Sequence, residues 1–245
     1  EGISVVTEDG HDVSSSLAML DAMSKCSVKG ILVDCHCEDE SFTASAKEYR
    51  KRALENNEDS ELAKIQAEAD LQEANRLLAL AEDIATERNI SLAKTAGCQL
   101  HVAHVSTANS IYAIREAKDE ANFTGGGFSI TCEVTPHHFA LNAETGDNLK
   151  LIVNPPLRSE IDRQALLQAF SDGVVDVIST DHAPHTLEDK QNGAPGFSGL
   201  ETSFAVANTE LVETDIISIN RLSSLMSANP AKILGLDNKD SFEGA

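Results

Sequence analysis

The chain has 245 residues, of which 41% are hydrophobic, and it carries a formal net charge of −21 from 19 basic and 40 acidic residues. Nucleic acid and anionic membranes require a basic surface, so this charge argues against both as partners. The apolar content is typical of a soluble protein, and no apolar run is long enough to cross a membrane.

The cysteines and the N-terminus point to a cellular compartment. The five cysteines are an odd number without zinc-ribbon spacing. Three of them fall in predicted strands, where free Cys behaves as a small buried hydrophobe: Cys35, Cys37 and Cys132. The first residues lack the basic region of a signal peptide. We expect a reducing, cytoplasmic protein without disulfides, and the missing initial Met suggests an internal piece of a longer chain.

The chain begins with a predicted strand at residues 2–6 and a turn that contains Asp9. A helix capped by Ser14 or Ser15 follows. Its predicted apolar face consists of Leu17, Leu20, Ala22 and Met23.

A second strand starts at residues 31–33 and ends in a polar stretch that contains His36. Residues 44–96 are rich in Ala, Glu, Leu, Lys and Arg, which are strong helix formers. Asn56 and Asn57 interrupt this segment, so we expect at least two helices. We interpret the charges of these helices as a solvated surface rather than as a binding site.

Two more strands carry histidines at their ends. Residues 99–105 predict the third strand, which contains His104, and a helix follows near residues 110–118. Residues 129–134 predict the fourth strand, which runs into a proline and a pair of histidines. The strands alternate with helices throughout this part of the chain.

The last predicted strand, at residues 175–180, is short, apolar and β-branched, which is typical of a buried strand. It follows a loop that contains Asn154 and a helix at about residues 161–170. Asp181 follows it directly, and His185 lies one short turn further along the chain. Taken alone, this stretch is explained equally well as a strand that ends in a polar loop without a function. A Gly-rich loop and further helices complete the chain.

This alternation of strand and helix, repeated about five times, predicts an α/β fold with a parallel sheet. Polar residues at the C-terminal ends of several strands favour a (β/α)8 TIM-type barrel, which builds its site there. A doubly wound sheet more often has a Gly-rich first turn, which is missing here. Five strands cannot close a barrel, so we expect an incomplete barrel that lacks its N-terminal strands.

Four residues at strand ends form a candidate metal site: Asp9, His36, His104 and Asp181. Imidazole nitrogen and carboxylate oxygen are donors that suit zinc. A lone histidine in a strand is more often a core residue than a ligand. Four donors at equivalent strand ends are difficult to explain in that way.

Six motifs resemble those of dihydroorotases, which belong to the amidohydrolase superfamily. They are HCED (36–39), HVAHVST (101–107), EVTPHH (133–138), NPPLR (154–158), STDHAPH (179–185) and GLET (199–202). They lie in the family's order along nearly the whole chain. The resemblance implies a metal-dependent TIM-type barrel that interconverts dihydroorotate and N-carbamoyl-L-aspartate in pyrimidine biosynthesis.

The resemblance also implies roles for single residues. His36, His104 and Asp181 would end barrel strands 5, 6 and 8 and bind zinc, with two ions in a complete site. Asp9 lies 27 residues before His36, where one class of dihydroorotase has a bridging aspartate. Glu8 is the neighbour that could be mistaken for it. Asp181 would also act as the catalytic base.

Substrate contacts are implied for four residues. Asn154 and His185 would bind the substrate, with His185 directed at its carboxylate, and the backbone of Pro195 and Gly196 would close over the ring. Asn154 also has a purely structural interpretation, as a turn residue before two prolines. The histidine pair at 137–138 matches the strand-7 motif, which is not primarily a ligand.

Two family features are missing from this sequence. One is the strand-1 His-x-His with its substrate-binding arginine, and the other is the C-terminal segment that helps complete a small β-sandwich. Residues 41–96 also match the family poorly. We interpret residues 1–245 as a partial amidohydrolase barrel domain, strands 4 to 8, with a helical insertion around residues 41–97. We expect this piece alone to be inactive.

Two alternatives remain open. A hydantoinase or allantoinase shares the barrel and the metal ligands, although His185 favours an acidic substrate. A catalytically inactive dihydroorotase-like subunit that supports an aspartate transcarbamoylase is the second alternative, because the strand-1 ligands are missing. A homodimer or a complex with that transcarbamoylase is the expected assembly.

Overall fold

The computed structural model describes residues 3–8, 12–56, 60–125, 127–145 and 151–236. Their centre is a sheet of five parallel strands in the order β1-β2-β3-β4-β5. The strands are β1 (Val5–Thr7), β2 (Leu32–Cys35), β3 (Gln99–Val102), β4 (Ser129–Val134) and β5 (Val177–Ile178). The predicted α/β class and the all-parallel sheet are confirmed, although the third strand is shorter than predicted.

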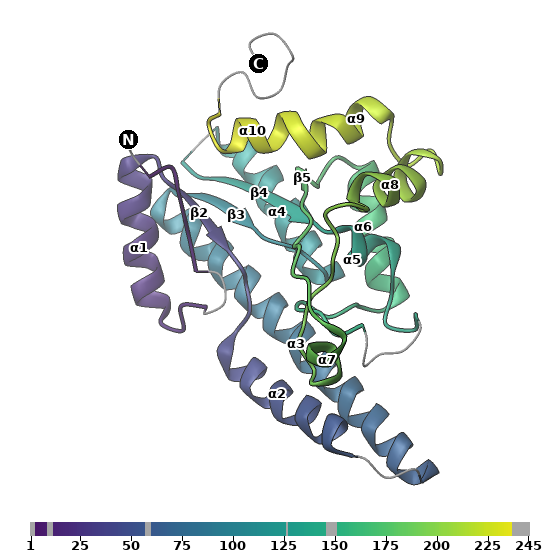
Figure 1. The fold of residues 1–245 in the computed structure, drawn as a ribbon. Coiled ribbons are helices and arrows are strands. Elements are labelled where there is room, and N and C mark those ends of the chain that lie inside the picture. The colour runs from purple at the N-terminus through teal and green to yellow at the C-terminus, as the bar shows by residue number, and fades with distance from the viewer. Residues whose placement is uncertain (1–2, 9–11, 57–59, 126, 146–150, 237–245) are drawn as a thin grey trace.

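Helices connect each strand to the next (Figure 1). The longer ones are α1 (Ser16–Lys29), α2 (Glu40–Glu55), α3 (Glu61–Ala96), α4 (Ala108–Thr124) and α6 (Glu160–Ser171). The shorter α-helices are α5 (Pro136–Ala140), α7 (Leu187–Gln191), α8 (Ser203–Ala207), α9 (Ile219–Ser223) and α10 (Asn229–Ile233). Two π-helical turns, η1 (Asn208–Val212) and η2 (Ser224–Ala228), join the last of them. No helix in the described ranges is both long and apolar enough to span a membrane.

Helix α1 begins where the sequence predicted, but it buries a different face. The Ser15 side chain accepts a hydrogen bond from the Ala18 N–H, which is the expected capping arrangement. The buried residues are Met19, Met23 and Cys26, spaced by three and four positions. The prediction was therefore wrong for Leu17, which is 77% exposed, and for Ala22, which is also exposed. The prediction was right for Met23, which is fully buried, and Leu20 is partly buried.

Helices α2 and α3 form a hairpin that projects below the sheet in Figure 1. The segment forms two helices, as predicted: α2 ends at Glu55, and α3 begins at Glu61, where the Ser60 side chain caps it by accepting a hydrogen bond from Ala63 N–H. The interpretation of the hairpin's charges as solvated surface is wrong in part. Glu82 and Asp70 are buried, and Arg50 is only partly exposed. Polar partners offset their desolvation: Asp70 accepts from Arg52 Nη2 over 3.0 Å, and the partners of Glu82 and Arg50 are described below.

The two faces of the sheet differ in chemistry. One face carries Val33, Leu100 and Cys132, which belong to the hydrophobic core beneath α1, α3, α4 and α6. The opposite face carries a row of neighbouring polar residues, Asp34, His101 and Thr131, which are aligned by the strand register. A core on one face and polar groups on the other is the pattern expected for a barrel wall with helices outside.

Strands β1 and β5 are each paired along one side only among the described residues, so the sheet is open. This agrees with the expected incomplete barrel.

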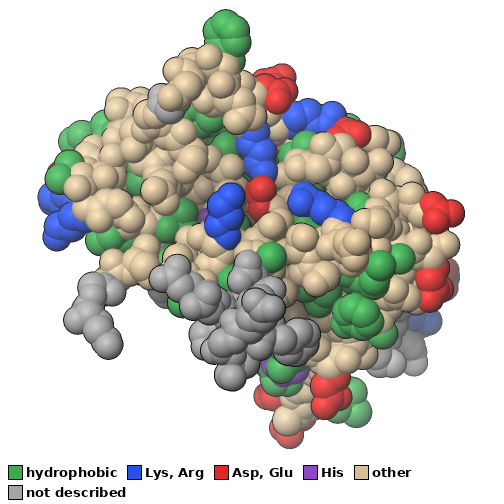
Figure 2. All heavy atoms as spheres, turned by 90° about the horizontal axis from the view of Figure 1, so that it is seen from above, with side chains coloured by type: hydrophobic (Ala, Val, Ile, Leu, Met, Phe, Trp, Pro, Cys, Tyr) green, Lys and Arg blue, Asp and Glu red, His purple; other side chains and the backbone are tan. Residues whose placement is uncertain are grey.

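The face seen from above in Figure 2 carries several Lys and Arg side chains near its middle, with Asp or Glu beside them. A cavity of about 400 Å³ opens at the start of β2, β3 and β4, and its lining includes Arg221, Asn229 and Lys232.

Candidate functional site

Three of the four predicted metal ligands come together at the C-terminal ends of the strands. His36 directly follows β2, His104 lies two residues after β3, and Asp181 lies three residues after β5. They line one cavity of about 180 Å³, together with Thr7, Asp34, Ala103 and Glu133. Because β2, β3 and β5 are parallel members of one sheet, their ends meet at one edge. We call this the strand-end cavity.

His36 and His104 are in direct ring contact. Their ring centroids are 4.5 Å apart, with an interplanar angle of 83°. His104 has a φ of 31°, an uncommon conformation for a residue with a side chain, and its N–H donates to Glu133 Oε1 over 3.4 Å. Burial, aided by the charge of His36, lowers the pKa of His104, so its imidazole is neutral at neutral pH.

The neutral ring of His104 has an unused donor or acceptor atom. Its Nδ1 is buried and makes no hydrogen bond. A buried polar atom without a partner is costly, and such atoms are rare in native structures. Neutral imidazole is also the form of histidine that binds metals. The ring of His104 therefore has the protonation state and the free atom that a metal ligand needs.

The strand-end cavity offers two imidazoles and the carboxylate of Asp181, and these are the types of donor that zinc binds. In the described ranges, no three His, Cys, Asp or Glu side chains are grouped closely enough to hold a metal ion. Asp9, the fourth predicted ligand, lies outside the described residues. Its neighbour Glu8 accepts a hydrogen bond from Val13 N–H over 3.0 Å and does not line the cavity.

Asp181 has a left-handed backbone conformation, with a φ of 45°, which is uncommon for a residue with a side chain. The next residue, His182, is exposed, and its Nδ1 accepts the backbone N–H groups of Gly199 and Leu200 at 3.2 and 3.1 Å. His182 therefore holds the Gly-rich loop in place. It does not line the strand-end cavity, whereas Asp181 does.

The histidine pair after β4 is buried and neutral. Burial lowers the pKa of His137 to about 2 and that of His138 to about 3. His138 Nε2 lies 3.0 Å from the carbonyl oxygen of Pro155, which only accepts hydrogen bonds, so this nitrogen carries the proton. Its Nδ1 then accepts from the Thr135 hydroxyl over 2.7 Å. His138 thus fixes the loop that contains Asn154.

Asn154 lies in a second, smaller cavity beside the first. This inner cavity has a volume of about 130 Å³ and is lined by His36, Glu38, Lys47, Arg50 and Asn154, with apolar residues of the hairpin. His36 lines both cavities. Arg50 Nη1 donates to Asn154 Oδ1 over 2.6 Å. Asn154 is therefore more than a turn residue, because a side chain from α2 fixes its amide.

The other predicted substrate contacts lie on either side of α7 and are joined by hydrogen bonds. His185 Nε2 lies 2.8 Å from the carbonyl oxygen of Pro195, and the N–H of Gly196 donates to Ile152 O over 3.0 Å. Lys190 Nζ donates to the carbonyl oxygens of Ile152, Ala194 and Gly196. Pro195 lines an outer cavity of about 540 Å³ together with Asn154 and Arg50. The structure thus places Asn154 and the Pro195 loop on a shared cavity.

Gly196 has no room for a side chain. Its φ is 139°, and an added Cβ would lie 2.6 Å from Ala183 O and 2.7 Å from Ala183 Cβ. Gly196→Ala should therefore lower the free energy of unfolding by about 1–3 kcal/mol, because the overpacked loop must shift. Urea unfolding checks this. Gly173→Ala is the control, since Gly173 also has a positive φ but open space around it. Equal losses in the two variants would contradict the steric explanation.

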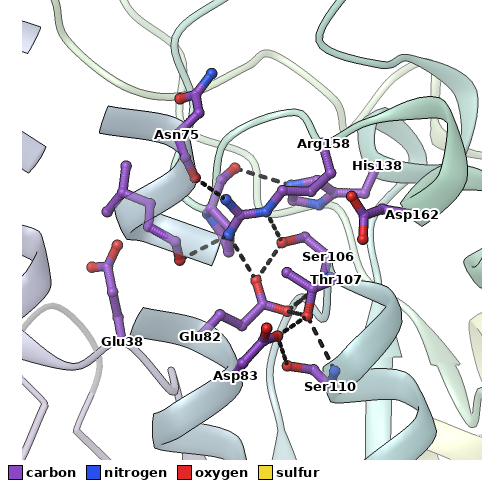
Figure 3. Close-up of polar contacts among 12 residues, drawn as sticks. Glu38, Asn75, Glu82, Asp83, Ser106, Thr107, Ser110, His138, Arg158 and Asp162 are labelled. Carbon is purple, nitrogen blue, oxygen red and sulfur yellow. Dashed lines mark hydrogen bonds and ion pairs between the residues drawn. The ribbon is translucent and has the colours of Figure 1, made fainter. Parts of the chain in front are cut away.

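A buried ion pair between Glu82 and Arg158 lies behind the strand-end and inner cavities (Figure 3). The sequence analysis did not predict it. Arg158 Nη2 lies 3.0 Å from Glu82 Oε2, and each side chain is 5% exposed. Arg158 also donates to Ser106 Oγ and to the carbonyl oxygens of Asn75 and Leu78. The pair joins α3 to the loop that carries Asn154.

Glu82 also binds the loop that follows His104. Its carboxylate accepts the backbone N–H groups of Ser106 and Thr107 at 2.8 and 3.0 Å, and the hydroxyl of Ser106 as well. Burial raises the pKa of Glu82, but Arg158 and these hydrogen bonds outweigh it and hold the pKa below its usual value. Arg158 belongs to the NPPLR motif, but no pattern in the sequence distinguished Glu82 from the other charges of its helix.

Comparisons with known proteins agree with this geometry. A model of the amidohydrolase family matches residues 2–243. A dihydroorotase of Clostridium botulinum (strain Eklund 17B / Type B) is 37% identical over 235 residues, which cover 96% of this chain and 49% of the relative. A dihydroorotase of Caldanaerobacter subterraneus subsp. tengcongensis is 40% identical over 243 residues, covering 97% and 52%. The chain spans about half the length of these relatives.

Solved structures share the fold. A D-hydantoinase (dihydropyrimidinase) from Thermus sp. superposes with a TM-score of 0.76 at 23% identity, covering 97% of this chain and 51% of that one. The L-hydantoinase of Arthrobacter aurescens gives 0.75 at 24% identity, covering 98% and 52%. The resemblance to the amidohydrolase superfamily read from the sequence is confirmed by the family match.

Proposed function

The chain belongs to the amidohydrolase family, and on this basis we propose that it forms the C-terminal barrel half of a dihydroorotase. The reaction would be the reversible hydrolysis of the cyclic amide of dihydroorotate to N-carbamoyl-L-aspartate. Relatives that are 37–40% identical and carry this name support the proposal. Dihydroorotase is favoured over a hydantoinase because the similarity to hydantoinases is lower, at 23–24% identity, and extends to the fold alone.

The observation that carries the proposal is the strand-end cavity. His36, His104 and Asp181 line it from three separate strands, and the buried Nδ1 of His104 has no hydrogen-bond partner. His36, His104 and Asp181, together with Asp9, would hold zinc, with about two ions in a complete site. Zinc would polarise the substrate carbonyl and lower the pKa of the attacking water.

The side chains of this chain would then perform the remaining tasks. Asp181 would take a proton from the nucleophile and deliver it to the departing ring nitrogen. Asn154 and His185 would bind the substrate, with His185 directed at its carboxylate. The Pro195-Gly196 backbone would close over the ring. The bond between His185 Nε2 and Pro195 O holds this histidine and this backbone together before any ligand arrives.

A substrate comparison tests the proposed function. The complete protein that contains this sequence should hydrolyse dihydroorotate in preference to hydantoin and allantoin, because His185 and Asn154 recognise an acidic ring. Preferred turnover of hydantoin or allantoin would identify a different cyclic amidase. Absence of turnover on all three substrates would favour an inactive subunit that supports an aspartate transcarbamoylase.

Metal content is a test that does not depend on turnover. After growth with zinc, the complete protein should contain about one or two zinc ions per chain by elemental analysis. His104→Ala should lower this content, because it removes a ligand. His182→Ala is the control, since His182 lies outside the strand-end cavity and should leave the metal bound. Metal content that is equal in both variants would count against the ligand assignment.

The 245-residue piece should itself be inactive. Its sheet is open at β1 and β5 in the described ranges, and unpaired strand edges favour association with other chains. Turnover of dihydroorotate by the purified piece, compared with the complete protein under the same conditions, checks this. Robust turnover would mean that the missing ligands have been misassigned.

A further inference from the structure

One lysine lies between the two backbone segments that border the outer cavity. Lys190, on α7, donates through Nζ to Ile152 O over 2.6 Å, to Ala194 O over 2.9 Å and to Gly196 O over 3.1 Å. These three acceptors match the three N–H groups of an ammonium, so none is left for a ligand. We call Lys190 and its three carbonyl oxygens the lysine clamp.

No carboxylate pairs with this ammonium among the residues that the structure describes. Burial lowers the pKa of Lys190, and the charge of Arg50 lowers it further. The adjacent acid, Asp189, instead accepts the N–H and the hydroxyl of Thr186 in the cap of α7. The carbonyl oxygens alone therefore stabilise the charge, through hydrogen bonds that are roughly twice as strong as neutral ones.

The lysine clamp joins the two walls of the outer cavity. Asn154 lines this cavity from one segment, and Pro195 lines it from the other. Ile152, on the first segment, accepts through one carbonyl oxygen both from Lys190 Nζ and from the N–H of Gly196, on the second segment. The position of the second wall relative to the first is thus set around the ammonium of Lys190.

The same ammonium lies against an aromatic ring that packs on the buried part of the site. Lys190 Nζ is 5.4 Å from the centroid of the Phe197 ring, within the range of a cation–π contact. The Phe197 ring meets His137 edge to face, with centroids 5.1 Å apart. The Phe197 carbonyl oxygen accepts the N–H of Ala183 over 2.9 Å. These contacts connect the lysine clamp to the loop that follows β5 and to the histidine that follows β4.

We propose that Lys190 is a positioning residue, whose ammonium fastens the Pro195-Gly196 segment to the segment that carries Asn154 before the substrate binds. Without the ammonium, the two segments spend less time in the arrangement that accepts the substrate. The apparent affinity falls in proportion to that fraction, while the chemistry of the bound substrate is unchanged. The inference rests on the proposed function in one respect, that these segments contact the substrate.

Steady-state kinetics of the complete protein test this role with Lys190→Met, which keeps an unbranched side chain and removes the ammonium. KM for dihydroorotate should rise about tenfold or more, as expected for a lost charge-assisted hydrogen bond. The value of kcat should change by no more than about twofold. The zinc content should stay at the wild-type level, because Lys190 does not line the strand-end cavity.

Two further substitutions of Lys190 complete the kinetic test. Lys190→Arg keeps a cationic donor at this position, so it should bring KM back to within about threefold of the wild-type value. Lys190→Gln replaces the cation by a shorter, neutral donor, so it should raise KM in the same direction as Lys190→Met. It takes the place of Lys190→Met if that variant does not fold.

Hydrogen exchange of the Gly196 amide tests the lysine clamp without turnover. This N–H donates to Ile152 O over 3.0 Å, and it should exchange about tenfold faster in Lys190→Met, because the bond opens more often when the ammonium is absent. Lys51→Met is the control for charge. Lys51 also borders the outer cavity, but it pairs with Glu55 along α2, so its removal should leave the exchange of Gly196 at the wild-type rate.

An unchanged KM in Lys190→Met, or a raised KM that Lys190→Arg does not lower, would overturn the positioning role. The two proposals also fail in different ways. If the complete protein hydrolyses dihydroorotate while Lys190→Met keeps the wild-type KM and Gly196 exchange, the lysine clamp is wrong and the function stands. If Gly196 exchanges faster in Lys190→Met but the wild-type protein hydrolyses no dihydroorotate, the function is wrong and the lysine clamp stands.

Discussion

Asp181→Asn should lower the turnover of dihydroorotate by the complete protein about 10²–10⁴-fold, the range typical for removal of a general base. An amide oxygen still coordinates a metal weakly, so much of the metal should remain bound. It takes no proton at neutral pH, so the lost function is the proton transfer. Steady-state kinetics and elemental analysis of the same preparation measure both effects. Near-normal turnover would assign the proton transfer to another group.

His185→Ala provides the contrast to Asp181→Asn. His185 does not line the strand-end cavity, so the metal ligands and the base should stay intact. The loss should appear mainly as a raised KM, because a contact made equally to substrate and transition state contributes uniform binding. If His185→Ala lost its metal, His185 would be a ligand and its role in substrate binding would be wrong.

Arg158→Met should lower the free energy of unfolding by about 3–5 kcal/mol, because it leaves the buried Glu82 carboxylate without its cation. Glu82 keeps its hydrogen bonds from Ser106 and Thr107, but these donors are neutral. The pKa of Glu82 is lowered in the folded protein, so the stabilisation is present above the unfolded pKa. It is lost as the pH falls through the folded pKa. Urea unfolding at neutral and at acidic pH measures the effect.

Two comparison variants identify the cause of that loss. Arg158→Met combined with Glu82→Gln should recover part of the stability, because the second change removes the unpaired charge. Arg76→Met should leave the urea midpoint unchanged, since Arg76 is exposed and pairs within one helix. An Arg158→Met protein as stable as Arg76→Met would show that the ion pair contributes little.

Regular patterns in the sequence predicted the sheet well. The β4 strand has the predicted bounds, Ser129–Val134, because apolar and polar residues alternate along it and glycines precede it. The strand-end position of His36, His104 and Asp181 also followed from the pattern, since parallel strands end at one edge. These features depend on residues close together in the chain, which a single sequence displays.

The contacts that support the site depend on residues far apart in the chain. Arg50 and Asn154 are 104 residues apart, and Glu82 and Arg158 are 76 residues apart. Arg50 and Glu82 lie within the segment 44–96, where each looked like any other charge on a helix surface. Burial distinguishes them, and burial is decided by which helix turn faces the sheet. The same reason explains why the apolar face predicted for α1 was only partly right: Met23 is buried, but Leu17 is exposed.

The position of bound zinc tests the central claim most directly, and anomalous scattering at the zinc absorption edge from crystals of the zinc-loaded complete protein would measure it. The account predicts a peak in the strand-end cavity, about 2.0–2.2 Å from a ring nitrogen of His36, a ring nitrogen of His104 and a carboxylate oxygen of Asp181. Zinc bound only at another place, or no peak in this cavity, would contradict it.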